Sequence, residues 1–285
     1  MKTELGMYPT YFSYALLYLA VATLLNFYMR MRERTLSTAD SAAGHGGIAF
    51  DIRHGAAHLG LAIAMIGVMY SESRGKLIDD LMLSAGYSLL AALFMIVSLE
   101  ITDKVILPGI RNVKELVNNN LAVAFVEAGA LVMTGNIAYA SIRGEEGGIV
   151  SSISYFLAGQ LSIVALVYIY EKLFVRKHDI RASIQSGKLS AGIYLSSKIV
   201  AYGLIIQSVI VSSDAAAPLA DKMLDFSTAA VAAMIMLYLL EILIDKIILL
   251  KTTVTGMLDN DRVGDAVQLA LTKIGMAMLL GLIIL

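Results

Sequence analysis

The 285-residue sequence has no cysteine, no tryptophan, only 3 prolines and little charge. The absence of cysteine excludes disulfide bonds, thiolate metal sites and cysteine nucleophiles. Charged residues make up 16% of the chain, whereas soluble domains usually hold about a quarter. In contrast, 58% of the residues are hydrophobic, and the mean hydropathy is +0.75. This composition is that of a membrane protein.

Charge and missing motifs also narrow the function. The net charge of −1 argues against a nucleic-acid partner, because binding to phosphates requires a basic surface. The chain has no Walker loop, no dinucleotide-binding glycine turn, no HExxH and no G-x-S-x-G sequence. We therefore expect that the protein is not an enzyme.

Long apolar runs predict the fold. A helix needs roughly 20 apolar residues to cross a bilayer, and eight stretches reach this length: 10–29, 48–70, 80–102, 120–142, 149–171, 189–212, 223–250 and 263–285. Their unbroken apolar character favours helices over the alternating strands of a barrel. We predict an all-α polytopic membrane bundle of eight transmembrane helices in contact with the lipid bilayer.

Lysines and arginines predict the orientation. The loops after the first, third, fifth and seventh spans hold 14 of them, including Arg30, Arg32 and Arg34, against 5 on the opposite side. Cytoplasmic loops of membrane proteins carry the excess of these residues. We therefore expect both termini on the outer side of the membrane.

An internal repeat organises the chain. The segments "LLNFYMRM", "SLEITDKV", "IYEKLFVR" and "LLEILIDK" place Asn26, Glu100, Glu171 and Glu241 in register. Each interval contains two spans, so all four units run in the same direction. The units cover about 1–75, 76–147, 148–218 and 219–285, and we predict four parallel two-helix repeats in a single membrane domain.

One repeated motif resembles a known family. The segment "NNNLAVAFVEAGALVMTG" at 118–135, with Asn120, Ala122 and Ala124 at the motif positions, and more weakly "SGKLSAGIYLSSKIVAYG", resemble the YjfL-like bacterial inner-membrane proteins, domain of unknown function 350. The resemblance implies a tandem fusion of two four-helix proteins in the bacterial inner membrane. It implies no activity, and the motif asparagine is replaced by Gly47, Lys188 and Arg262 in the other units.

The register residues are the first candidate site. Ionisable groups inside a membrane cost several kcal/mol and normally face a bundle interior, a partner or water. Asn26, Glu100, Glu171 and Glu241 could converge near a central axis and bind an inorganic cation, with Asp245 adding a second carboxylate beside Glu241. The alternative is that each carboxylate pairs with a lysine or with backbone donors and fixes helix packing.

The second candidate site is a metal centre. Asp51, His54 and His58 lie at i, i+3 and i+7, on one stripe of a helix, and Glu127 is the candidate for a fourth ligand. Such ligands suit a transition metal. The alternatives are a proton-responsive histidine pair, or polar groups satisfied around the adjacent Arg53. Apart from such a bound cation or metal, the sequence predicts no cofactor.

Three further ionisable groups lie in the middle of spans. Glu127, Lys198 and Lys273 have opposite signs that predict pairing across repeats, for example of Lys198 with Glu171 or of Lys273 with Glu241. Stretches of small residues favour close helix packing and a homo-oligomer.

Three functions remain open. The leading hypothesis is a channel-like or ion-coupled transport component with a repeated buried acidic layer. The second is a non-conducting membrane scaffold or stress-associated protein whose charges are internally paired. The third is a membrane metal-binding protein that uses Asp51, His54 and His58.

Overall fold

The computed structural model describes residues 8–36, 47–69, 77–143, 148–174, 179–213, 217–248 and 253–284. Eight of its helices are long and apolar enough to cross a membrane. They are α2 (Tyr8–Leu36), α3 (Ile48–Met69), α4 (Leu77–Ile101), α6 (Leu121–Arg143), α7 (Gly148–Phe174), α9 (Leu189–Val211), α10 (Leu219–Ile248) and α12 (Val263–Ile284). The described residues form no strand, and the predicted all-α membrane bundle is confirmed.

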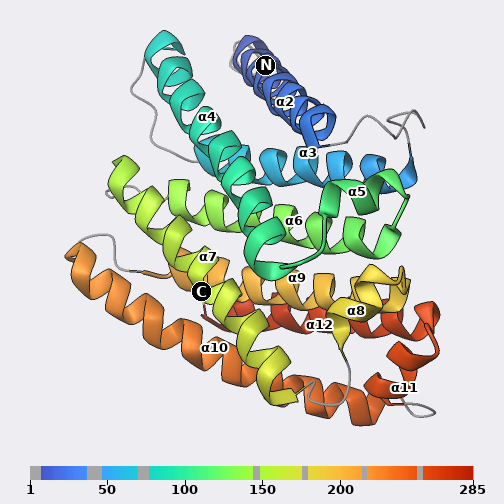
Figure 1. The fold of residues 1–285 in the computed structure, drawn as a ribbon. Coiled ribbons are helices and arrows are strands. Elements are labelled where there is room, and N and C mark those ends of the chain that lie inside the picture. Colours follow the sequence, from blue (N-terminus) through green and yellow to red (C-terminus); the bar gives the residue numbers. More distant parts are fainter. Residues whose placement is uncertain are drawn as a thin grey trace.

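A short helix precedes the second span of each of the last three repeats, α6, α9 and α12. These short helices are α5 (Asn112–Val117), α8 (Ile180–Gln185) and α11 (Val254–Asp259), and they lie together at one end of the bundle (Figure 1). Each is followed by a residue with positive φ, namely Asn119, Gly187 and Asp261. This left-handed backbone turns the chain into the next span, and glycine or asparagine adopts it most easily.

The four spans that end the repeats form a row. Helices α3, α6, α9 and α12 pack side by side in this order, from blue to red in Figure 1. Glycines bring their backbones close together: a Cβ atom at Gly135 would overlap the carbonyl oxygen of Gly60, and one at Gly192 would overlap that of Ala122. Small residues at helix interfaces allow this approach.

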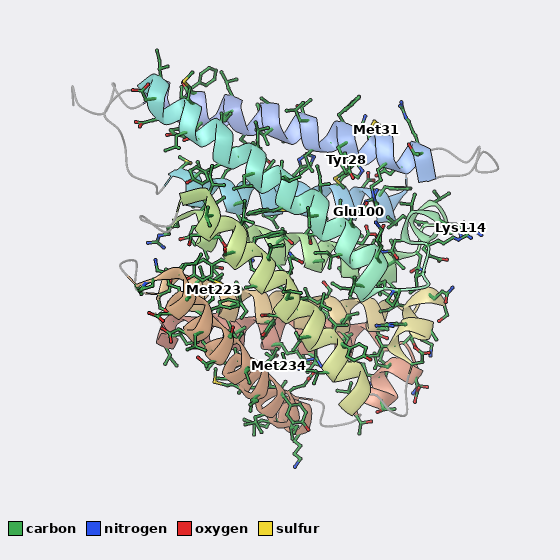
Figure 2. The ribbon with its side chains drawn as sticks, turned by 60° about the vertical axis from the view of Figure 1, so that its left-hand side comes forward. Tyr28, Met31, Glu100, Lys114, Met223 and Met234 are labelled. Atoms are coloured by element: carbon green, nitrogen blue, oxygen red, sulfur yellow. The ribbon has the colours of Figure 1, made fainter. Side chains whose placement is uncertain are left out.

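The other four spans cover the row. Figure 2 shows α2, α4, α7 and α10 following one another across the molecule. These helices expose large apolar side chains, such as Phe12, Leu161 and Ile235, which belong in contact with lipid. The helices α6 and α9 at the centre of the row are mostly buried. The repeats are thus arranged in a line and not around a central axis.

Two helix ends differ from the sequence prediction. Helix α2 continues to Leu36, so Arg30, Arg32 and Arg34 lie on the helix and not in a loop. Helix α4 continues as the π-helix η1 (Thr102–Ile106), which contains Lys104. The reason is that both extensions bury polar side chains against each other, a gain that hydropathy does not detect.

Side chains from neighbouring repeats cap the row helices. Asn119 Oδ1 accepts a hydrogen bond from the backbone N–H of Ala49 at 3.0 Å. Asp261 Oδ1 accepts the equivalent bond from Ser190 at 2.8 Å. The first N–H groups of a helix have no partner within the helix, so these contacts stabilise the helix and join adjacent repeats.

Candidate functional site

A buried arginine lies at the centre of the N-terminal half. Arg53, on α3, is only 1% exposed. Its Nη2 contacts Glu33 Oε1 on α2, and its Nη1 donates to Glu127 Oε2 on α6 at 3.4 Å. Glu127 is completely buried. An unpaired charge would be very unfavourable there, so the three side chains hold three helices together through their mutual pairing.

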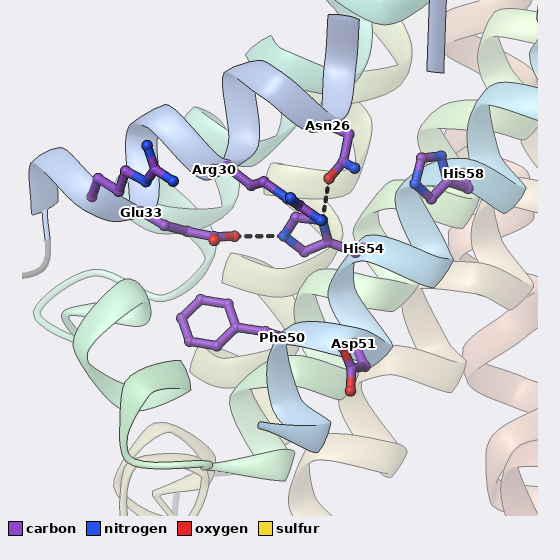
Figure 3. Close-up of a pocket in the computed structure, with 8 residues that line it drawn as sticks. Asn26, Arg30, Glu33, Phe50, Asp51, His54 and His58 are labelled. Atoms are coloured by element: carbon purple, nitrogen blue, oxygen red, sulfur yellow. Dashed lines mark hydrogen bonds and ion pairs between the residues drawn. The ribbon is translucent and has the colours of Figure 1, made fainter. Parts of the chain in front are cut away.

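His54 connects this group to a polar surface. Its Nε2 lies 2.6 Å from Glu33 Oε1, and its Nδ1 lies 2.8 Å from Asn26 Oδ1 (Figure 3). Two acceptors suit the doubly protonated ring, in which both nitrogens donate. If the Asn26 amide turns over, its NH₂ group faces Nδ1 and suits the neutral ring. The position therefore accommodates both proton states of the imidazole.

A second branch joins α2 to α4 and η1. Arg32 Nε donates to Glu100 Oε1 at 3.0 Å, and Arg32 Nη2 contacts Asp103 Oδ2. Lys104 Nζ lies 2.8 Å from Glu100 Oε2, and Asn112 Nδ2 donates to Asp103 Oδ1 at 2.6 Å. These contacts explain why η1 continues α4 with unusual geometry, since π-helical turns often occur where side chains must be re-aimed.

Asp103 and Glu127 connect the two branches. The carboxyl group of Glu127 interacts electrostatically with the carboxyl group of Asp103 and with the guanidinium of Arg32. The buried Oε1 of Glu127 has no hydrogen-bond donor in the structure. A proton held between neighbouring carboxyl groups would supply the missing donor.

We call these connected side chains the N-terminal network. Its charged members are four carboxylates, three permanent cations and one histidine: Glu33, Glu100, Asp103 and Glu127; Arg32, Arg53 and Lys104; and His54. With every carboxylate ionised, the charges balance only when His54 is protonated. Charge neutrality of the network therefore requires one bound proton in addition to its three permanent cations.

A cavity of about 500 Å³ opens between α2 and α3 beside His54 (Figure 3). This volume falls within the range of small-molecule sites. Eight residues line what we call the α2–α3 cavity: Asn26, Arg30, Glu33 and Arg34 from α2, and Phe50, Asp51, His54 and His58 from α3.

The C-terminal half holds a different group, which we call the lysine–glutamate cluster. Glu241, on α10, lies 2.7 Å from Lys198 Nζ on α9 and 2.5 Å from Lys273 Nζ on α12. Tyr194 donates its hydroxyl hydrogen to Glu241 Oε1 at 2.6 Å, and Lys273 Nζ lies 3.9 Å from the centre of the tyrosine ring. All four residues are buried. One carboxylate is therefore shared by two lysines, and the face of the tyrosine ring provides a further favourable contact for Lys273.

Comparison with known families decides the classification. A family model described as Domain of Unknown Function (DUF350) matches the chain twice, over residues 3–142 and 146–284. The chain belongs to this family. Each match contains two helix pairs, which confirms the predicted tandem fusion. No curated protein and no solved structure matches the chain.

The asparagine of the DUF350-like motif has a clear structural position. Asn120 Nδ2 donates to the carbonyl oxygens of Ile184 and Gln185, at the end of the next repeat's α8. Lys188 stands at the equivalent place one repeat later, and its Nζ donates to the carbonyl of Asp259 at 2.9 Å, at the end of α11. These carbonyls lack partners within their own helices, so the motif position joins neighbouring repeats.

The described register residues of this DUF350 chain do not converge. Asn26 contacts His54, Glu100 binds Arg32 and Lys104, and Glu241 belongs to the lysine–glutamate cluster. The side chains of Glu171 and Asp245 lie outside the described ones. Because the repeats form a row, equivalent positions repeat along it and do not face a common axis. The predicted pairing of Lys273 with Glu241 is present.

The helix α3 triad is not assembled as a metal centre. His54 is held by Asn26 and Glu33, and Asp51 and His58 line the cavity wall. Glu127, the proposed fourth ligand, pairs with Arg53 on the α6 side of α3. No group of three or more histidine, aspartate or glutamate side chains in the described ranges could hold a metal ion. Projection from one stripe aligns side chains, but ligation also requires a partner helix to supply ligands on that side.

Several members of these groups do not stand out in the sequence. Arg32 and Glu33 follow the end of the first apolar run, Asp103 follows the third run, and Tyr194 lies within an apolar span. One signal was present for Glu33, because Asn26, Arg30 and Glu33 continue the spacing of one helical face beyond the apolar run.

Proposed function

We propose that this protein is an ion-coupled membrane transport component in which the N-terminal network takes up and releases protons. The observation that carries the proposal is the position of His54. It lines the α2–α3 cavity and also touches Glu33, the first member of the buried network. Protons in the cavity therefore have direct access to a group that is linked to the bundle interior.

The network carries the effect of the proton into the bundle. The proton binds at His54 and Glu33, and Arg53 joins Glu33 to Glu127, which interacts electrostatically with Asp103. A guanidinium keeps its protons, so the link through Arg53 transmits charge and not the proton itself. Carboxylates and histidines inside membrane proteins commonly take up and release protons. The network joins α2, α3, α6 and η1, so a change in its charge alters the forces between these elements. That is the kind of coupling a transporter requires.

The proposal also assigns an orientation. The end that carries α5, α8 and α11 faces the cytoplasm, on the basis of the excess of lysine and arginine in the loops there. The protons would then enter the α2–α3 cavity from the cytoplasmic half of the membrane.

Proton flux in proteoliposomes tests this function. The purified protein is reconstituted around a pH-sensitive dye, and a potassium gradient with valinomycin imposes a membrane potential. We expect proton uptake that His54→Gln and Glu127→Gln each reduce at least tenfold, while Asp225→Asn, a carboxyl change at an exposed position of α10, leaves it unchanged. Flux equal to that of empty liposomes, from protein that remains folded, would contradict the proposal.

One observation favours a second function, that of a non-conducting membrane scaffold. In the lysine–glutamate cluster, Glu241 is bound by two lysines and a tyrosine, an arrangement suited to locking α9, α10 and α12 together. Such a protein would show no flux in the same assay, and neutral variants of the N-terminal network would change only its thermal stability.

A further inference from the structure

The α2 wall of the cavity carries two arginines one helical turn apart. Arg30 and Arg34 line the α2–α3 cavity together with Asn26 and Glu33, and the guanidinium of Arg30 lies beside His54 (Figure 3). The spacing of i, i+4, i+7 and i+8 from Asn26 onward directs all four toward one side of α2. Two donor groups therefore reach the same space.

The charges of this space do not balance. Glu33 is engaged by Arg53 and His54, so it does not neutralise the cavity arginines. In the part of the chain that the structure describes, neither Arg30 nor Arg34 has an ion-pair partner. The remaining carboxylate in the wall is Asp51, on α3. Two cations facing one free carboxylate leave a positive charge that attracts an anion.

We propose that the α2–α3 cavity binds a phosphate group through Arg30 and Arg34. A guanidinium presents a rigid fork of donors that matches phosphate oxygens, and two of them on one wall can hold one phosphate from two sides. Phe50 supplies an apolar surface for an organic substituent. The volume of about 500 Å³ accommodates a small phosphate ester as well as the phosphate itself.

The phosphate has two sources with the same chemistry. It belongs either to a soluble phosphate compound in the cytoplasm or to a lipid headgroup, since arginines near a helix end lie at headgroup level. The inference deepens the proposed function by naming a ligand for the same cavity. Its coupling to protons rests on that function, but phosphate binding does not.

Binding is measured with the full chain in neutral detergent. Inorganic phosphate and glycerol 3-phosphate are titrated while the apparent melting temperature is followed. In a parallel experiment, the protein is transferred to nanodiscs of phosphatidylcholine with or without an anionic phospholipid. A saturable rise in melting temperature with the soluble probes identifies a soluble phosphate ligand. A rise with anionic lipid only identifies the headgroup.

Two variants decide whether the arginines are responsible. We expect Arg30→Gln with Arg34→Gln to weaken the response at least tenfold in probe concentration, and Arg111→Gln, which removes an exposed positive charge beside α5, to leave it unchanged. The inference is overturned if neither source of phosphate raises the melting temperature, or if the double variant responds like the unchanged protein. Phosphate binding without proton flux would refute the proposed function alone.

Discussion

Removal of Glu241 is the sharpest test of the lysine–glutamate cluster. The Glu241→Gln substitution keeps the size of the side chain but removes the carboxylate that lies within 2.7 Å of Lys198 and 2.5 Å of Lys273. Both lysines are 2% exposed. Breaking a buried ion pair by removing one partner costs about 3–5 kcal/mol. At about 2–4 °C for each kcal/mol, the apparent melting temperature should fall by about 6–20 °C.

Removal of a lysine should have a much smaller effect. In Lys273→Met, the remaining Lys198 and Glu241 still form a neutral pair, and the repulsion between the two ammonium groups disappears. We expect a change of less than about 1.5 kcal/mol, because methionine fills most of the same volume. The triple change of Lys198, Glu241 and Lys273 to methionine should recover most of the stability that Glu241→Gln loses, since apolar replacement of a buried ionic group is often neutral or stabilising.

Thermal unfolding of the purified protein in detergent measures these effects. Asp225→Asn is the matched control, because it removes a carboxylate from the same helix, α10, at an exposed position. If Glu241→Gln has the same melting temperature as Asp225→Asn and the unchanged protein, the two lysines do not require the carboxylate. A loss of stability in Lys273→Met as large as that in Glu241→Gln would show that the excess positive charge of the cluster does not govern its stability.

Three further substitutions test the contacts within and between the repeats. Gly135→Ala should lower the melting temperature, because its Cβ atom would overlap the backbone of Gly60. At Gly275 a Cβ atom would meet nothing within 4 Å, so Gly275→Ala should raise the melting temperature. The higher helix propensity of alanine adds up to about 1 kcal/mol to the free energy of unfolding. Equal responses would show that α3 and α6 do not pack through this glycine. Asn120→Ala removes the bonds to α8 and to the start of α6, and we expect a loss of about 1–3 kcal/mol together with faster proteolysis near residue 185. Unchanged proteolysis would mean that Asn120 does not hold α8 in place.

Membrane spans and repeats were predictable from local features. Whether a segment crosses a bilayer depends on about 20 consecutive side chains, and that information is contained within each segment. The register of Glu100 with Glu241 was visible for the same reason, since it required only alignment of the chain with itself. Composition indicated a membrane protein, and the unbroken apolar runs indicated helices.

Side-chain partners were much less predictable. The pairing of Lys273 with Glu241 was one of several alternatives, and the pairing of Lys198 with the same carboxylate was not among them. Arg32 and Glu33 could not be found from hydropathy, because the apolar run ends at residue 29 whereas α2 continues to Leu36. A charged residue can extend a membrane helix when a neighbouring helix supplies its counter-charge, and the identity of that neighbour is not a local property.

The sequence by itself determined that this protein crosses the membrane eight times as four repeats of one orientation. Only the tertiary structure decided that the repeats form a row, because that arrangement depends on which glycines of α3, α6, α9 and α12 meet. The row then determined the chemistry. It separated the N-terminal network from the lysine–glutamate cluster and left the α2–α3 cavity open beside His54. Buried charges select their partners by distance, and only packing sets those distances.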